Sequence, residues 1–230
     1  MFSPTAFKFL RDLKRNNRRE WFEARRDIYE RELRAPLREL IEELDVRLAR
    51  IAPELYGDPK RSVFRIHRDT RFSKDKSPYK HNVGFWVNHR SLGRSAEHIH
   101  GGAGLYFHFE PGASMIAAGI WMPPAPALTK IRAALAENHK KFDATIRTLR
   151  RRFSALSEEA VLQRLPRGYS EDHPAARWLR YKSFTSHRML TAAELRSPRL
   201  PDTLARDYAT TIPFVRWLNS ALGLPPATRR

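Results

Sequence analysis

Residues 60–81 concentrate side chains that bind anions or transfer protons. This stretch holds eight lysine or arginine residues against two aspartates. The planar guanidinium groups of its arginines suit two-point contacts with phosphates or carboxylates, and its lysines and tyrosine add further hydrogen-bond donors. The segment therefore predicts a ligand-binding site made of Arg65, Arg68, Asp69, Arg71, Asp75, Lys76, Tyr79 and Lys80.

The two aspartates, Asp69 and Asp75, admit two interpretations. The surrounding positive charge favours their ionised forms, so either could orient an arginine, hold a metal ion or act as a base. Alternatively, both pair with neighbouring cations and only fasten a long loop to the sheet, because structural ion pairs create the same charge environment as catalytic sites. We take the ligand site as the working hypothesis and keep the structural staple as its alternative. No metal ligand is assigned, and the need for a cofactor stays open.

The string R-x-x-R-D-x-R-F-x-x-D-K-x-x-Y, which runs from Arg65 to Tyr79, resembles the signature of a family of bacterial conserved hypothetical proteins, domain of unknown function 2461. The N-terminal stretch from Phe9-Leu10 to Trp21-Phe22 and the segment 106–121 with its Pro111-Gly112 are similar to the family pattern as well. The resemblance therefore covers nearly the whole chain. It implies that the signature is the site, and it implies no reaction, cofactor or catalytic residue.

The N-terminal residues 3–52 predict helices, because apolar side chains recur there at helical spacing. Ser3 before Pro4 is a helix start with proline at the first position. Asn17 and Glu20 have the spacing of a capping box. Pro36 should break or kink the helix that follows, since its ring removes a backbone hydrogen bond.

Residues 60–122 contain the predicted sheet and the signature loop. The apolar pattern changes there to period two, and Pro111-Gly112 predicts a tight turn that makes the last two strands a hairpin. Helices return over residues 125–222, so we expect one α+β domain over residues 1–230: an antiparallel sheet of about four or more strands flanked by N-terminal and C-terminal helices. The predicted strands are residues 63–68, 83–87, 105–110 and 115–121.

Two weaker motifs also contain groups that do chemistry. The stretch Glu97-His98-Ile99-His100 offers two imidazoles to a metal ion, but no further ligand completes the set, and a solvated loop is the favoured interpretation. His67 and His108 would form a polar cluster with Glu110 beneath the signature loop if neighbouring strands align them, which depends on a register that sequence does not fix.

The charge balance indicates polyanionic partners without naming one. The 230 residues carry 43 lysines and arginines against 25 acidic residues, a formal net charge of +18. These charges are spread along the chain, including a basic helix over 147–152, whereas an evolved nucleic-acid surface should cluster them. The arginine-rich composition also fits a GC-rich coding bias. The absence of cysteine excludes a thiol nucleophile and cysteine-bound metals.

No run of apolar residues reaches the length of a membrane span, and the N-terminus lacks the pattern of a signal peptide, so we expect a cytoplasmic protein with no membrane partner. The leading functional hypothesis is a module that binds an anionic, phosphorylated ligand through Arg65, Arg68 and Arg71. The alternatives are a hydrolytic or phosphoryl-transfer enzyme that uses Asp69 or Asp75, a nucleic-acid-binding protein, and a structural staple without a ligand.

Overall fold

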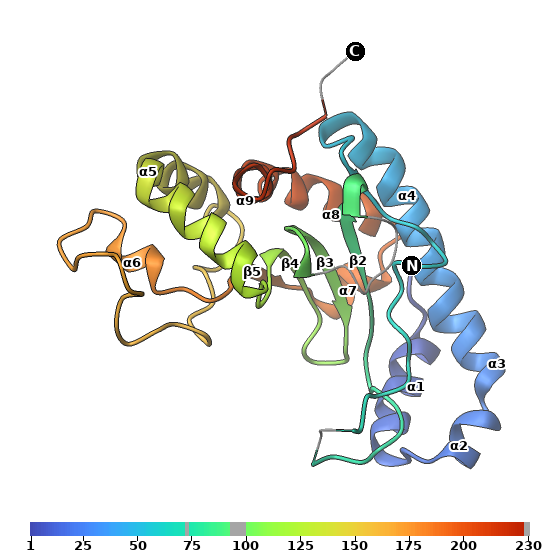
Figure 1. Cartoon of the computed structure of the whole chain (residues 1–230). Coiled ribbons are helices and arrows are strands. Elements are labelled where there is room, and N and C mark those ends of the chain that lie inside the picture. The colour runs from blue at the N-terminus through green and yellow to red at the C-terminus, as the bar shows by residue number, and fades with distance from the viewer. Residues whose placement is uncertain (72–73, 93–99, 228–230) are drawn as a thin grey trace.

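The fold is built on an antiparallel sheet. A computed structural model describes residues 1–71, 74–92 and 100–227, and in these residues five strands pair in the order β1-β2-β3-β4-β5. Helices from both ends of the chain surround the sheet (Figure 1), which confirms the predicted α+β class. The strands are β1 (Leu55–Tyr56), β2 (Val83–His89), β3 (Gly104–Phe109), β4 (Met115–Ile120) and β5 (Phe184–Met189).

The N-terminal helices begin as the sequence indicates. Ser3 caps the first of them, because its hydroxyl oxygen accepts a hydrogen bond from the Ala6 N–H at 3.2 Å. Pro36 lies in the first turn of the last of them, and a π turn directly precedes it. The predicted break is therefore a π turn within a continuous helical path. The elements are α1 (Pro4–Arg15), α2 (Arg19–Glu23), α3 (Arg26–Tyr29), the π-helix η1 (Glu30–Arg34) and α4 (Ala35–Ile51).

The C-terminal half contains helices and one strand that the sequence prediction missed. β5 lies inside the region 125–222, which was predicted as helical throughout. This strand pairs with β4 alone and buries only Phe184 and Ser186, so its six residues carry no apolar stripe of period two. The helices are α5 (Ala125–Leu149), which is interrupted at Asn138, α6 (Ala176–Leu179), α7 (Ala192–Arg196), α8 (Leu200–Ala209) and α9 (Ile212–Ala221).

The two faces of the sheet differ in polarity, as the alternation along β3 predicts. Leu105, Phe107 and Phe109 are fully buried, and the ring of Phe7 in α1 packs 4.8 Å from the ring of Phe109. The hairpin of β3 and β4 is confirmed, and its turn requires Gly112, whose φ is +90°. The short helix η2 (Arg90–Leu92) follows β2. Among the described helices, none combines the length and the apolar character needed to cross a membrane.

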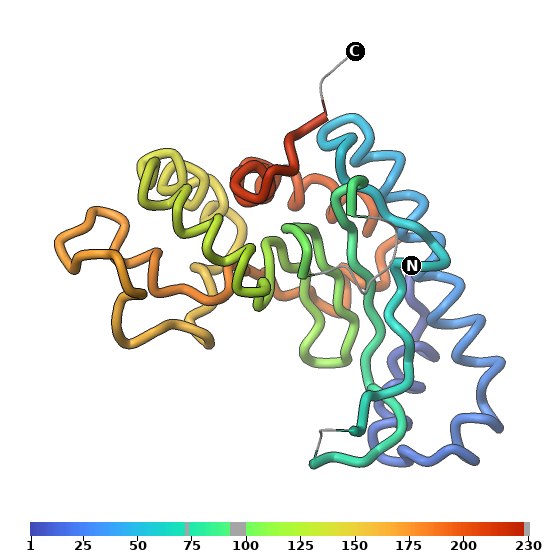
Figure 2. The backbone as a smooth tube through the Cα atoms, in the orientation of Figure 1, coloured from blue at the N-terminus to red at the C-terminus, as the bar shows by residue number. Residues whose placement is uncertain are grey.

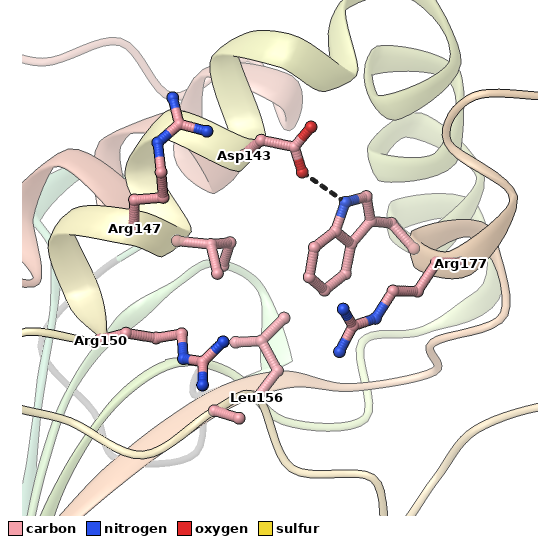
Figure 3. Close-up of a pocket in the computed structure, with 8 residues that line it drawn as sticks. Asp143, Arg147, Arg150, Leu156 and Arg177 are labelled. Atoms are coloured by element: carbon pink, nitrogen blue, oxygen red, sulfur yellow. Dashed lines mark hydrogen bonds between the residues drawn. The ribbon is translucent and has the colours of Figure 1, made fainter.

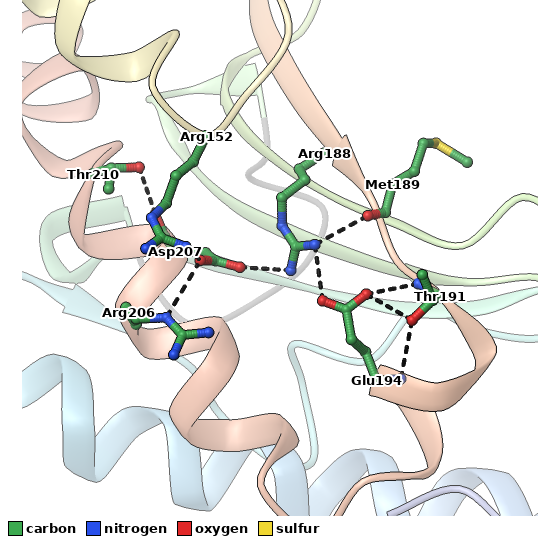
Figure 4. Close-up of polar contacts among 8 residues, drawn as sticks. All are labelled: Arg152, Arg188, Met189, Thr191, Glu194, Arg206, Asp207 and Thr210. Carbon is green, nitrogen blue, oxygen red and sulfur yellow. Dashed lines mark hydrogen bonds and ion pairs between the residues drawn. The ribbon is translucent and has the colours of Figure 1, made fainter.

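One buried carboxylate ties the C-terminal elements together (Figure 4). Asp207 of α8 is 1% exposed. Its oxygens lie 2.9 Å from Arg152, which follows α5, and 2.5 Å from Arg188 of β5. Arg188 in turn donates a hydrogen bond to Glu194 of α7 at 2.9 Å. Helix α8, strand β5 and the segment after α5 thus meet at the Asp207 carboxylate, and α7 is joined to them through Arg188. The buried charge is stabilised only while its cations stay in place.

We expect Asp207→Asn to lower the free energy of unfolding by about 3 kcal/mol, because it leaves the half-buried Arg188 without its main counter-charge. Urea denaturation measures this change. Asp202→Asn is the matched control on the same helix, since the Asp202 pair with Arg47 is largely exposed and should cost less than about 1 kcal/mol. Equal losses in the two variants would contradict the special role of Asp207.

Candidate functional site

The predicted site lies on a two-stranded ribbon at the edge of the sheet, which we call the signature ribbon (residues 62–80). The N-terminal strand of the ribbon, which we call its first arm, runs alongside β2, because the Phe64 N–H donates to the Gly84 carbonyl at 3.0 Å. Farther on, the two arms pair with each other, because the Lys80 N–H donates to the Ile66 carbonyl at 2.8 Å. The predicted strand 63–68 is therefore present only as isolated pairs. Residues 72 and 73, including the predicted apolar anchor Phe72, lie outside the described residues.

Tyr79 fastens this ribbon to the N-terminal helices, which run beside it in Figure 2. Its side chain is 1% exposed and stacks on Phe22 of α2 with 4.2 Å between ring centres. The Asn17 side-chain amide donates to the Tyr79 carbonyl at 2.8 Å, and its oxygen accepts from the Tyr79 N–H at 3.0 Å. The structure therefore makes Tyr79 an anchor, and its burial leaves little of the side chain to contact a ligand.

The predicted capping box at Asn17 and Glu20 was wrong, because the Asn17 side chain bonds to the main chain of Tyr79 and not to its own helix. α2 begins at Arg19, and its N-terminal cap, Arg18, makes no side-chain hydrogen bond. Asn17 uses both its donor and its acceptor on the main chain of Tyr79 instead. A side chain that can cap its own helix can equally satisfy a distant backbone, and sequence spacing does not distinguish the two.

We expect Asn17→Ala to leave the Tyr79 main chain without its two partners, which costs about 1–3 kcal/mol of unfolding free energy. Hydrogen exchange of the Tyr79 amide should accelerate. Asn16→Ala is the control, because the Asn16 amide bonds to Asp12 of its own helix and not to the ribbon. Unchanged exchange at Tyr79 in Asn17→Ala would show that stacking on Phe22 alone holds the ribbon.

Three cations of the ribbon are occupied by the protein's own acceptors. Arg71 makes two hydrogen bonds to Asp69, at 3.0 and 2.7 Å, and Arg68 pairs with Asp75 at 2.7 Å. The Lys76 ammonium donates to the Thr70 carbonyl at 2.9 Å. The Arg71 contact holds the pKa of Asp69 far below its usual value, and hydrogen bonds from Ser77, reinforced by Arg68, lower the pKa of Asp75. The ion pairs of the structural alternative are thus present.

Arg65 and Lys80 are two cations at the base of the ribbon. Neither side chain makes an ion pair with a carboxylate of the described residues, although the charge of Arg65 contributes to lowering the pKa of Asp69. The Lys80 ammonium lies 5.6 Å from the centre of the Phe64 ring. Burial lowers the pKa of Lys80, and the positive charges of Arg65 and Arg68 lower it further. These cations therefore repel one another at the base of the ribbon, and a bound anion would relieve that repulsion.

A cavity of about 310 Å³ opens between this base and the N-terminal helices. Arg26 and Arg34 line it from the helices, each already paired: Arg26 with Glu23 at 2.9 and 2.7 Å, and Arg34 with Glu30 at 2.8 and 3.1 Å. Lys60 and Arg65 line it from the other side, and neither makes an ion pair with a described carboxylate. We call this space the ribbon cavity. Its lining residues are Phe22, Arg26, Tyr29, Glu30, Arg34, Lys60, Val63, Phe64, Arg65, Ile66 and His67.

A chain of polar side chains crosses the outer face of β3 beside the ribbon. The Tyr106 hydroxyl lies 2.9 Å from Nδ1 of His108, and Nε2 of His108 lies 3.3 Å from Glu110. The other Glu110 oxygen lies 3.0 Å from His81. Glu110 can only accept, so Nε2 of His108 carries the proton and Nδ1 accepts from Tyr106. We predicted that His67 would join His108 and Glu110 in a polar cluster, but His81 takes that place. The ring of His67 instead lines the ribbon cavity and packs against Tyr79, with 5.1 Å between ring centres.

Burial lowers the pKa of His108, although its hydrogen bond to Glu110 acts in the opposite direction. In the unfolded chain His108 titrates near its ordinary pKa of about 6.5. Below that pH the unfolded chain binds more protons than the folded one, so the unfolding free energy falls as the pH drops through the interval between the two pKa values.

We therefore expect the ring protons of His108 to titrate below pH 6.5 in a nuclear magnetic resonance experiment. The acid loss of stability should be smaller in His108→Gln than in the unmodified protein, and buffers from pH 7.5 to 5 should reveal the difference. Glu110, His81, Tyr106 and Lys14 face this histidine and stay in place in the variant. A titration midpoint above pH 6.5 would mean that the hydrogen bond to Glu110 raises the pKa of His108 more than burial lowers it.

The predicted site residues thus divide into three groups. Arg65, Arg68 and Lys80 meet at the base of the ribbon. Asp69, Arg71, Asp75 and Lys76 form the paired tip, and Tyr79 is the buried anchor. The predicted list of site residues omitted Lys60 and His81, although they are the first and last residues of the segment 60–81 that the sequence singled out. It also omitted Arg26 and Arg34, which lie on the N-terminal helical segment and needed the tertiary structure.

The weaker motifs do not converge on this site. Residues 97–99 of the predicted histidine pair lie outside the described residues, and Nδ1 of His100 lies 2.8 Å from the Trp121 carbonyl. Within the described parts of the chain, no group of three histidine or acidic side chains is placed to hold a metal ion. The basic end of α5 lies on the other side of β3 and β4 from the ribbon (Figure 1). The ribbon thus runs along β2, whereas the segment that follows α5 runs along β5, at the far edge of the sheet.

These features define the class: an α+β protein with an antiparallel meander, helices from both termini, and a basic ribbon packed against an N-terminal helical wall. A family model described as "Conserved hypothetical protein (DUF2461)" matches residues 5–217, and the chain belongs to that family. No curated protein and no solved structure matches the chain.

Proposed function

We propose that this protein binds an anionic, phosphorylated small molecule in the ribbon cavity. The observation that carries the proposal is that Arg65 and Lys60 line a cavity of about 310 Å³ and that neither side chain makes an ion pair or hydrogen bond with a carboxylate of the described residues. A guanidinium and an ammonium at the rim of a concave site match the oxygens of a phosphate group. The net charge of +18 would steer such a ligand toward the protein.

The walls of the ribbon cavity support a ligand larger than a free phosphate ion. Its volume lies at the lower end of the range for small-molecule sites. Phe22, Tyr29 and Phe64 contribute aromatic surface, and burial raises the pKa of Tyr29 to about 12, so this residue stays neutral. These aromatic side chains would therefore contact an apolar or planar part of the ligand, while Arg65 and Lys60 at the rim would bind its phosphate.

Binding fits the geometry better than catalysis by Asp69 or Asp75. Both carboxylates are paired with arginines, and neither lines the ribbon cavity. Nucleic-acid binding by both basic segments would need the ribbon and the basic end of α5 to share a surface, and they lie toward opposite edges of the sheet (Figure 1). Arg68 and Arg71, on which the sequence hypothesis relied, do not line the ribbon cavity, and their guanidinium groups already contact Asp75 and Asp69.

Adenosine monophosphate is a suitable probe, because it joins a phosphate to a planar body, and adenosine is its uncharged counterpart. We expect calorimetry to detect binding of the monophosphate and not of adenosine. Arg65→Ala combined with Lys60→Ala should weaken binding by about 10- to 100-fold or more, since hydrogen bonds to charged groups contribute about 1.5–3 kcal/mol. Both side chains are exposed and lack described partners, so the fold should be retained.

Arg71→Ala is the matched control, because Arg71 is an exposed arginine of the same ribbon that does not line the cavity. It should change the affinity less than twofold. An equal loss in Arg71→Ala would indicate a nonspecific effect of positive charge. Equal binding of adenosine would remove the anionic part of the proposal, and retained binding in the double variant would remove the site.

A further inference from the structure

A second cavity lies at the C-terminal end of α5, on elements that the ribbon cavity does not use (Figure 3). Its volume is about 190 Å³. Ile146 of α5, Leu156 and Trp178 of α6 form its apolar walls, and they are 4–8% exposed. Three arginines surround these walls: Arg147, Arg150 and Arg177.

The aromatic wall of this cavity is held rigidly. The indole Nε1–H of Trp178 donates to the Asp143 carboxylate at 2.8 Å (Figure 3). The ring also packs edge-on against Phe142, with 5.2 Å between ring centres. Asp143 is the carboxylate among the lining residues, and this hydrogen bond already engages it. The indole therefore presents a fixed apolar surface to the cavity.

The positive charge at the rim exceeds its compensation. Arg147 and Arg150 make no side-chain hydrogen bond or ion pair with the described residues. Arg177 lies 4.7 Å from the centre of the Trp178 ring, and its nearest described carboxylate, on Glu158, is 4.0 Å away. In Figure 3 the guanidinium groups of Arg150 and Arg177 reach toward each other across Leu156. Two donors thus approach one space from opposite sides.

We propose that this cavity binds a small anion with a ring-sized apolar body, such as an aryl phosphate or an aromatic carboxylate. An apolar cavity of about 150 Å³ holds a benzene ring, so a space of about 190 Å³ accepts a ring. The ring would lie on Ile146, Leu156 and Trp178. The anionic head would lie between Arg150 and Arg177, whose planar forks donate to paired oxygens.

This site is independent of the ribbon cavity, because no residue lines both. The two proposals therefore fail separately. Phenyl phosphate is the probe, with benzoate as the carboxylate form of the same ligand, benzyl alcohol as the uncharged ring and inorganic phosphate as the head without a ring. The indole Nε1–H resonance of Trp178, assigned from its absence in Trp178→Phe, reports on occupation of this cavity and not of the ribbon cavity.

We expect phenyl phosphate to shift that resonance in a saturable way, and to bind at least tenfold more tightly than benzyl alcohol and inorganic phosphate. Arg150→Ala should weaken binding about tenfold or more, and Arg150→Lys should restore part of it. Arg151→Ala is the matched control, because Arg151 is an exposed neighbour that does not line the cavity. The Arg65→Ala, Lys60→Ala double variant should bind phenyl phosphate here as the unmodified protein does.

Three results would overturn the inference. An unshifted Trp178 resonance at saturating phenyl phosphate would show that the cavity stays empty. Equal losses in Arg150→Ala and Arg151→Ala would show general attraction to positive charge. Inorganic phosphate binding as tightly as phenyl phosphate would show an adventitious ion only. Should Arg150→Ala fail to fold, Ala155→Phe supplies the second variant, since its larger side chain would fill a space that Ala155 lines; unchanged binding in that variant would contradict the site.

Discussion

The rest of the site depends on the two-point hydrogen bond between the Asn17 amide and the main chain of Tyr79. This contact joins segments that are 62 residues apart in the sequence, and the stack of Tyr79 on Phe22 reinforces it. Phe22 also lines the ribbon cavity. Phe22 therefore contributes both to the contact that holds the ribbon and to the wall of the cavity.

The charges of the signature ribbon serve two purposes that composition alone does not separate. At the tip, Arg71 and Lys76 are engaged by Asp69 and by a backbone carbonyl, and these exposed contacts shape the loop while adding little stability. At the base, Arg65 and Lys80 are close together and lack carboxylates. Cations that make no ion pair within the described fold are a feature expected of a ligand site, whereas the paired tip fits the structural alternative.

Local rules predicted the parts of the fold that depend on neighbouring residues. The Ser3 cap, the alternation of buried and half-buried side chains along β3, and the turn at Gly112 all follow from spacing of a few residues. The clamp formed by Asn17 was not predictable, because the same side chain satisfies a local cap or a distant backbone equally well. The sequence also could not say whether His67 or His81 reaches Glu110, because that choice depends on the path of the ribbon.

The π turn Glu30–Arg34 has a consequence for how this protein tolerates change. A π turn contains one more residue per hydrogen-bonded ring than an α turn. Removing one residue there would rotate everything on its N-terminal side by about 100° relative to α4. Arg26 and Phe22 would then leave the cavity wall, while the apolar stripe of α4 would stay in register with the core. Chain length at this turn is therefore constrained in addition to the identity of its residues, which include the buried Leu33 and the paired Glu30 and Arg34 of the cavity wall.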